Sequence, residues 1–231
     1  MTALALSPDI QFSLHRLGRE GHPLMVVDRV LAEPDTLIDQ AAAAEWYVPE
    51  HTHYPGRNAA VPETYYGPLI AGIRGPLEAA FGLPRASGLD YFGFFALAST
   101  GAAEAKPVQK IPHHDSPNPG RLALVHYLCR GDFGGTGFFR HKATGFESID
   151  GRRHNGYLAT VGEELTTVQG QTYASEGMSH YDLIGRSDAV FNRLIVYRSH
   201  VLHSGLLGDG RLANDPRTGR LTVNGFIEAR P

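Results

Sequence analysis

Hydrophobic positions in the first 88 residues predict one short strand and two helices. Residues 24–27 form an apolar run of strand length. Residues 34–46 are rich in alanine, start with residues that cap helices, and repeat apolar side chains at helical spacing. Residues 66–81 show the same spacing and are followed by Gly82, which is typical of a helix end. We therefore expect residues 1–88 to be mostly helical.

From residue 89 onward, short β-rich runs alternate with clusters of Gly, Pro, Asn and Asp. Such spacing is typical of a barrel or a double-sheet jelly roll. We predict a single, mainly β domain over residues 1–231, in which a jelly roll (a double-stranded β-helix, as in cupins) occupies 89–231 and N-terminal helices support it. Residues 146–188 lack this pattern and are predicted to be an insertion with one helix near 162–168. The expected strands are Tyr91–Ala98, Pro107–Ile111, Leu122–Leu128, Gly137–Arg140, Leu194–Tyr197 and Leu221–Ile227.

Composition agrees with a turn-rich globular protein. The chain has 27 glycines and 15 prolines in 231 residues, and its 42% hydrophobic content is enough to form a core, which excludes global disorder. A net charge of −3 without a basic block argues against a general nucleic-acid binder. Because Cys129 is the one cysteine, an internal disulfide and a multi-cysteine zinc site are excluded.

The same sequence shows no secretory leader and no apolar run of the roughly 18 residues that a membrane span needs. We therefore expect a cytoplasmic protein with neither a membrane nor a nucleic-acid partner. The expected partner is a small-molecule or peptide substrate, and homo-oligomerisation is left open.

Histidines and a carboxylate suggest metal chemistry. His113 and Asp115 lie two residues apart at a predicted strand end, so their side chains point to the same side and can meet one ion. His200 and His203 follow a later apolar strand, and either can supply a third ligand. Two histidines and one carboxylate suit non-haem Fe(II), because open positions remain for a bidentate cosubstrate and O₂. Taken alone, His113 and Asp115 also fit a solvated turn.

Three further stretches bear on this hypothesis. Alternation from residue 220 places Arg220 and Thr222 on one strand face, where a guanidinium and a hydroxyl can bind a carboxylate. Residues 134–139 contain a glycine hinge that enters an aromatic strand and lacks the features of a phosphate loop. Tyr127 lies on the strand after the candidate metal pair. Each stretch alone also fits a structural role, such as a hairpin turn or a solvent-exposed arginine.

In this order, the stretches resemble the Fe(II)/2-oxoglutarate-dependent oxygenases, in particular the prolyl-hydroxylase-like branch and a small bacterial subfamily without an assigned function. The similarity covers about residues 24–228. It lies in a His-x-Asp strand followed by a Tyr-Leu strand (113–128), a Gly-Gly turn and strand (134–139), and a distal histidine followed by Arg-x-Thr (192–203 and 220–222).

The resemblance implies an activity and a set of site residues. The implied activity is hydroxylation of an unactivated C–H bond in an amino acid, a peptide or a small metabolite, with release of succinate and CO₂. Fe(II), 2-oxoglutarate and O₂ are implied, while a need for ascorbate is left open. The intact carboxylate argues, by family analogy, against halogenation. The implied metal ligands are His113, Asp115 and His203, and the far carboxylate of 2-oxoglutarate would meet Arg220, Thr222 and Tyr127.

Two assignments have rivals within the sequence. His200 competes with His203, and the family spacing favours His203. Arg220 follows His203 by 17 residues, farther than is usual in the family, which makes Arg211 a rival. We prefer Arg220 because it opens an apolar strand and shares a face with Thr222.

Two other functional classes stay open at this point. The first is a jelly-roll metalloprotein that uses the same three ligands without 2-oxoglutarate, as a hydrolase or isomerase. The second is a jelly roll that binds a sugar or a partner without catalysis. Other polar residues are expected to be structural: His114 on the opposite strand face, His126 and His141 in the core or in solvent, and Arg140 and Lys142 at a solvated strand end.

Overall fold

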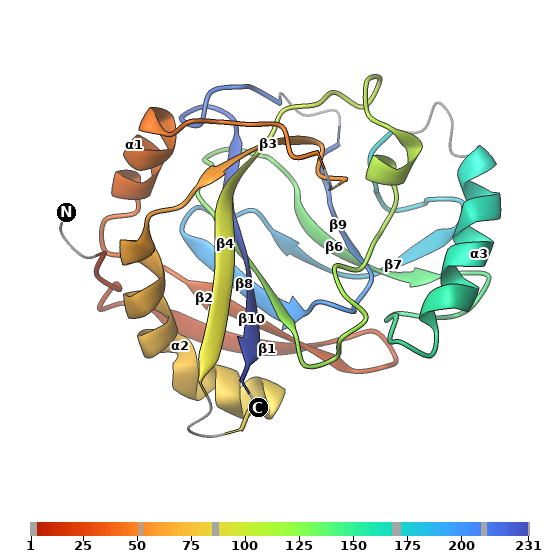
Figure 1. Ribbon diagram of the computed structural model, residues 1–231, viewed down its shortest axis with the longest axis horizontal. Helices are drawn as coiled ribbons and strands as arrows, with labels where there is room; N and C mark the ends of the chain where they lie inside the picture. The colour runs from red at the N-terminus through yellow and green to blue at the C-terminus, as the bar shows by residue number, and fades with distance from the viewer. Residues whose placement is uncertain (1–3, 51–52, 85–87, 168–171, 209–211, 231) are drawn as a thin grey trace.

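The computed structural model describes residues 4–50, 53–84, 88–167, 172–208 and 212–230 (Figure 1). Within these ranges the chain forms two antiparallel sheets, one of seven strands in the order β1-β2-β8-β5-β10-β4-β3 and one of three strands in the order β7-β6-β9. The strands are β1 Gln11–Leu17, β2 His22–Asp28, β3 Gly56–Ala60, β4 Leu89–Ala98, β5 Leu122–Tyr127, β6 Gly135–His141, β7 Tyr181–Asp188, β8 Arg193–Arg198, β9 His203–Gly205 and β10 Arg220–Ala229.

The connections between the sheets are those of a jelly roll. The short segment at His113 pairs with His203 in β9 and therefore acts as a further strand of the smaller sheet. From β4 onward, the strands in chain order are β4, the His113 segment, β5, β6, β7, β8, β9 and β10. In the larger sheet the neighbours run β4-β10-β5-β8. In the smaller sheet they run from the His113 segment to β9, β6 and β7. The predicted mainly β, double-stranded β-helix fold is confirmed.

The two predicted N-terminal helices are present as α1, Asp35–Ala43, and α2, Tyr66–Phe81. They lie on one side of the molecule (Figure 1), and their buried residues pack against one face of the larger sheet. The expectation that residues 1–88 are mostly helical is wrong, because β1, β2 and β3 extend both ends of that sheet. β1 is almost wholly exposed and β3 reads Gly-Arg-Asn-Ala-Ala, so backbone pairing rather than an apolar pattern makes them strands.

Two further expectations need correction. Residues 146–188 contain α3, His154–Glu164, followed by a short 3₁₀ helix at Leu165–Thr167. The predicted insertion ends earlier than residue 188, because β7 belongs to the smaller sheet and pairs along the whole of β6. β7 was missed because charged residues and a glycine interrupt its apolar positions. The strand expected at residues 107–111 is a 3₁₀ helix, Pro107–Lys110, which begins with proline and in which the Lys106 N–H donates to the Gln109 side-chain oxygen at 2.8 Å. No helix within the described ranges is long and apolar enough to cross a membrane.

The larger sheet separates two groups of side chains. Leu221 and Val223 of β10 pack toward the helices. Phe226 of the same strand, together with Tyr127 of β5, packs on the opposite face. Arg220 and Thr222 alternate with Leu221 and Val223, so they share this second face, as the period-two pattern predicts. This second face lies toward the smaller sheet, and the candidate site lies between the two sheets.

Candidate metal centre and pocket

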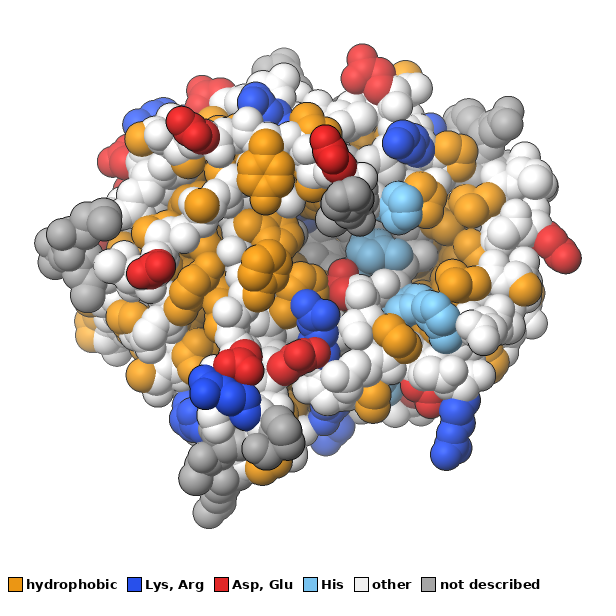
Figure 2. Space-filling model, in the orientation of Figure 1, with side chains coloured by type: hydrophobic (Ala, Val, Ile, Leu, Met, Phe, Trp, Pro, Cys, Tyr) orange, Lys and Arg blue, Asp and Glu red, His pale blue; other side chains and the backbone are white. Residues whose placement is uncertain are grey.

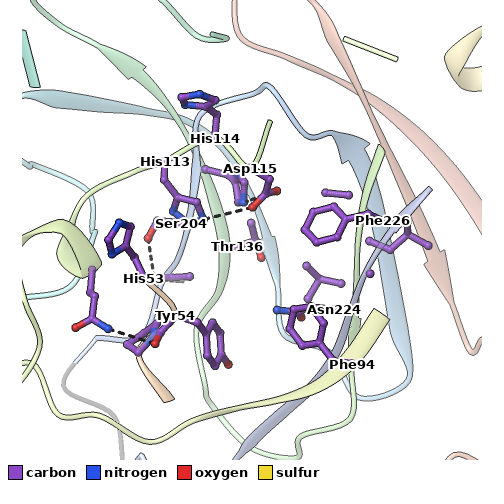
Figure 3. A pocket seen from close by; sticks show the side chains of 18 of the residues that line it. His53, Tyr54, Phe94, His113, His114, Asp115, Thr136, Ser204, Asn224 and Phe226 are labelled. Atoms are coloured by element: carbon purple, nitrogen blue, oxygen red, sulfur yellow. Dashed lines mark hydrogen bonds and ion pairs between the residues drawn. The ribbon is translucent and has the colours of Figure 1, made fainter. Parts of the chain in front are cut away.

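A pocket of about 460 Å³ is lined by residues from both sheets. Figure 2 shows the corresponding hollow, with histidine and acidic side chains inside and hydrophobic and basic side chains at its edge. In the close view of Figure 3, His113, His114 and Asp115 lie on one side, Phe94, Asn224 and Phe226 on another, and Thr136 between them. The pocket is therefore concave, largely apolar and supplied with a few polar groups, as ligand sites generally are.

The predicted His-x-Asp pair meets His203 in this pocket. Ligand atoms of His113, Asp115 and His203 all lie within 4.8 Å of one another. The Asp115 carboxylate is 3.8 Å from Nε2 of His113 and 3.5 Å from Nε2 of His203. The backbone N–H of Asp115 donates to the carbonyl of Ser199 at 2.8 Å, which fixes the segment beside the loop that precedes β9. The three side chains can therefore bind one ion together.

The protonation states of these residues suit a divalent metal. Burial lowers the pKa of His203 to about 4. Although about half of the His113 side chain is exposed, the enclosing pocket lowers its pKa to about 4 as well, and the neighbouring His203 contributes. Burial raises the pKa of Asp115, while His113 and Arg121 oppose this effect. Both imidazoles are thus neutral at pH 7, as metal binding requires.

A hydrogen bond orients the His203 ring. Its Nδ1 lies 2.9 Å from the carbonyl oxygen of Val201, so Nδ1 carries the proton and Nε2 is the free ligand atom. Two neutral imidazoles and one carboxylate form the ligand set of non-haem Fe(II) sites with open positions. The residues present therefore fit Fe(II).

The other described histidines lie outside this group of ligands. His200 packs edge-on against His22 at 5.1 Å, so the structure places His203, and not its rival, beside His113 and Asp115. The remaining three that the sequence singled out have protein partners: His114 contacts His154 at 3.1 Å, His126 lies between Tyr65 and Asn192, and His141 contacts Glu164 at 2.9 Å. Arg140 and Lys142 point away from the pocket, to Glu147 and to the Met178 carbonyl.

Arg220 also lines the pocket and is only 4% exposed. Its Nη2 donates to the carbonyl of Gly135 at 2.9 Å, and its Nε to that of Phe133 at 3.3 Å. Within the described ranges, no carboxylate lies within ion-pair distance of this guanidinium. Since a buried charge is normally paired, Arg220 is suited to bind an anion that enters the pocket. Its rival Arg211 lies outside the described residues.

Thr222 and Tyr127 lie behind the pocket wall. The Thr222 hydroxyl contacts the carbonyl of Ala96 at 3.3 Å and Oδ1 of Asn224 at 2.9 Å. The Tyr127 hydroxyl is 2.7 Å from Oγ1 of Thr136, and it is Thr136 that lines the pocket. Sequence reasoning missed Thr136, although the residue belongs to the glycine hinge that it had singled out. It also missed Tyr54, another lining residue, in a Tyr-Pro-Gly-Arg turn.

Comparison with known proteins places the chain in a family. Residues 8–227 match the model described as "Family of unknown function (DUF6445)". The chain belongs to this family. No curated protein sequence matches this DUF6445 chain.

Several solved structures are similar to the DUF6445 chain. A Pseudomonas putida prolyl-4-hydroxylase is 16% identical, with 96% of this chain and 93% of that one covered, at a TM-score of 0.45. HygX from Streptomyces hygroscopicus, with nickel and 2-oxoglutarate bound, is 10% identical, with 91% and 84% covered, at 0.49. EvdO2 from Micromonospora carbonacea var. aurantiaca is 13% identical, with 91% and 88% covered, at 0.46.

Proposed function

We propose that this protein is an Fe(II)- and 2-oxoglutarate-dependent dioxygenase that hydroxylates an unactivated C–H bond in an amino acid, a peptide or a small metabolite. The observation that carries this proposal is a single pocket lined both by the His113, Asp115 and His203 ligand set and by Arg220, a buried cation with no carboxylate partner among the described residues. A 2-oxo acid with a second carboxylate satisfies both groups: its oxo-acid end can chelate a metal, and its far end can pair with a guanidinium.

The chain's own residues have distinct tasks in this proposal. His113 and His203 supply neutral imidazoles, and Asp115 supplies one negative charge toward the metal. Arg220 binds the far carboxylate, and the carbonyls of Phe133 and Gly135 hold its guanidinium in place. Bound Fe(II) and 2-oxoglutarate together supply the activation of O₂, with formation of succinate and CO₂. The mainly apolar wall of the pocket can contact the apolar part of a substrate.

The decisive experiment removes the arginine and keeps the metal ligands. In the wild-type protein, anaerobic Fe(II) followed by 2-oxoglutarate should produce the weak visible charge-transfer band of a chelated ferrous centre and raise Tm. Arg220→Ala should bind Fe(II) as before but bind 2-oxoglutarate about a hundredfold more weakly, because a charge-assisted contact worth about 3 kcal/mol is lost. Arg130→Ala, which breaks an exposed pair with Asp35, is the matched control and should behave like the wild type.

Two results would contradict the proposal. If the wild type shows neither the band nor stabilisation by the metal and cosubstrate together, 2-oxoglutarate is not its ligand. If Arg220→Ala retains full affinity for 2-oxoglutarate, the buried guanidinium has another role. A protein that binds metal but never 2-oxoglutarate would correspond to the hydrolase or isomerase class.

A further inference from the structure

A second arginine lies at the edge of the pocket, and neither the metal ligands nor the proposed carboxylate site uses it. Arg121 precedes β5, lines the pocket and has a side chain that is 31% exposed. Its guanidinium lies over the ring of Phe226, 4.3 Å from the centroid. Nε of Arg121 is buried and has no hydrogen-bond partner among the described residues. A cation is thus held in place at the pocket with donor capacity left unused.

The carboxylates near Arg121 do not neutralise it fully. Glu228 approaches its Nε only to 3.8 Å, which is beyond hydrogen-bond distance. The Glu228 side chain is 48% exposed and also accepts a bond from Asn118 at 3.4 Å, so water and a competing donor weaken its attraction to Arg121. Asp115 belongs to the ligand set, where a metal would offset its charge. An anion entering the pocket can therefore compete for Arg121.

An aromatic surface adjoins this arginine. Phe92 and Phe94 on β4 lie 5.8 Å apart, and both line the pocket together with Phe226 on β10. Phe92 is 62% exposed, so its ring is accessible to a ligand at the edge of the pocket. Figure 3 shows Phe94 and Phe226 facing the pocket across from His113 and Asp115. This surface can bury an apolar group of a ligand while the metal centre lies opposite it.

We propose that the edge of the pocket binds a substrate that combines an apolar or aromatic body with a carboxylate. Arg121 takes the carboxylate, and Phe92 and Phe94 contact the body. The inference rests on the proposed function, because it assigns the substrate class of the same pocket. It narrows that class from amino acids, peptides and metabolites in general to molecules with a free carboxylate close to an apolar group.

The test compares carboxylates with amides of the same shape. The probes are 3-phenylpropionate against 3-phenylpropionamide and hexanoate against hexanamide. Binding to the full chain is measured by calorimetry with saturating Zn²⁺ and 2-oxoglutarate, which occupy the metal centre and Arg220. In the wild type, at least one carboxylate should bind about tenfold more tightly than its amide, as expected for one charge-assisted contact.

Three variants test whether Arg121 causes the preference for carboxylates over amides. Arg121→Gln should remove it, and Glu228→Gln should increase it, because a competing carboxylate is lost. Arg130→Gln is the matched control, since Arg130 also lies over an aromatic ring, Phe191 at 3.7 Å, but does not line the pocket. This control should keep the wild-type preference.

Equal binding of carboxylates and amides by the wild type, or a preference that survives in Arg121→Gln, would overturn the inference. A titration with 2-oxoglutarate before the probes keeps the two proposals apart. If 2-oxoglutarate fails to bind the metal-loaded wild type, the proposed function fails, and the carboxylate preference is then measured in the Arg220→Ala background. If 2-oxoglutarate binds and Arg121 has no effect, only the substrate inference fails.

Discussion

His113 and His203, 90 residues apart in the sequence, exchange two backbone hydrogen bonds, of 2.9 Å from the His113 N–H and 2.8 Å from the His203 N–H. Such a pair places both side chains on the same face of the bridge, and the two rings lie 4.5 Å apart. The relative position of the two imidazoles is therefore set by backbone pairing between the His-x-Asp segment and β9. Little side-chain rearrangement is needed to bind an ion.

This pairing predicts that His203, and not His200, is the third ligand. His203→Ala should weaken anaerobic Fe(II) binding by more than the 10- to 100-fold that is typical for loss of a group supporting a ligand. His200→Ala should leave the affinity within about twofold of the wild type, because that ring packs on His22 away from the ligand set. Calorimetry with Fe(II) measures both variants, and circular dichroism checks that each is folded. A large loss in His200→Ala with none in His203→Ala would contradict the assignment.

The pocket wall predicts different effects for two threonines. Thr136 lines the pocket, and its Oγ1 is 2.7 Å from the Tyr127 hydroxyl. When Tyr127 donates in this pair, the proton of Thr136 can be donated to a bound carboxylate. Thr222 is fully buried and contacts Ala96 and Asn224 instead. Thr136→Val should weaken 2-oxoglutarate binding about tenfold, the value of one hydrogen bond to a charged group, and Thr222→Val less than about threefold. The Kd from titration of the visible band decides, and the reverse order would contradict the placement.

The two threonines also show how far the sequence could predict this site. A spacing of two residues reveals which side chains share a strand face, and on that basis His113 was grouped with Asp115 and Arg220 with Thr222. That spacing does not show which of the side chains on a shared face reaches the pocket. That outcome depends on neighbouring strands, and here Tyr127 and Thr136 from two other strands determine which hydroxyl reaches the pocket.

The same distinction holds for the fold. Apolar runs predicted β4, β5, β8 and β10, since strands in a sheet covered on both faces need buried side chains. β1, β3 and β7 were missed because exposed, small or charged residues occupy them, and pairing with a neighbouring strand decides their conformation. Such pairing is a tertiary effect, which a local pattern does not record.

The hydrogen bonds of the ionised Glu20 side chain predict that the protein loses folding stability in acid. Burial alone would raise the pKa of Glu20, but hydrogen bonds from Ser148, His22 and Arg153 outweigh burial and lower this pKa to about 2, from 4.5. Its contribution to folding is therefore complete above pH 4.5 and is lost as the pH falls through 2. Allowing for screening of a side chain that is partly exposed, Glu20→Gln should lower the free energy of unfolding by about 2 kcal/mol at pH 7.

The effect of Glu20→Gln should fall to about half at pH 3, where the unfolded chain is already protonated. Urea unfolding at both pH values measures it. Asp39→Asn, which removes an exposed ion pair with Arg217, is the control and should change stability by less than about 1 kcal/mol at either pH. A Glu20→Gln effect that is equal at pH 7 and pH 3 would show that ionisation of Glu20 is not its cause.

Gly134 should be essential for the carboxylate site for a reason that its matched control, Gly145, does not share. Both have positive φ, +71° and +72°, so alanine strains the backbone equally at each position. A Cβ on Gly134, however, would lie 1.8 Å from the carbonyl oxygen of Leu206, whereas nothing lies within 4 Å of one on Gly145. Displacing this turn would move the adjacent Gly135 carbonyl, which accepts a bond from Arg220.

Gly145→Ala should therefore cost about 1–2 kcal/mol of stability and leave 2-oxoglutarate binding unchanged. Gly134→Ala should cost at least about 2 kcal/mol more and, where the variant still folds, weaken binding of 2-oxoglutarate without affecting binding of Fe(II). Urea unfolding and titration of the visible band measure the two effects. If the variants lose equal stability and bind 2-oxoglutarate equally, backbone strain alone explains the glycine, and the turn does not position Arg220.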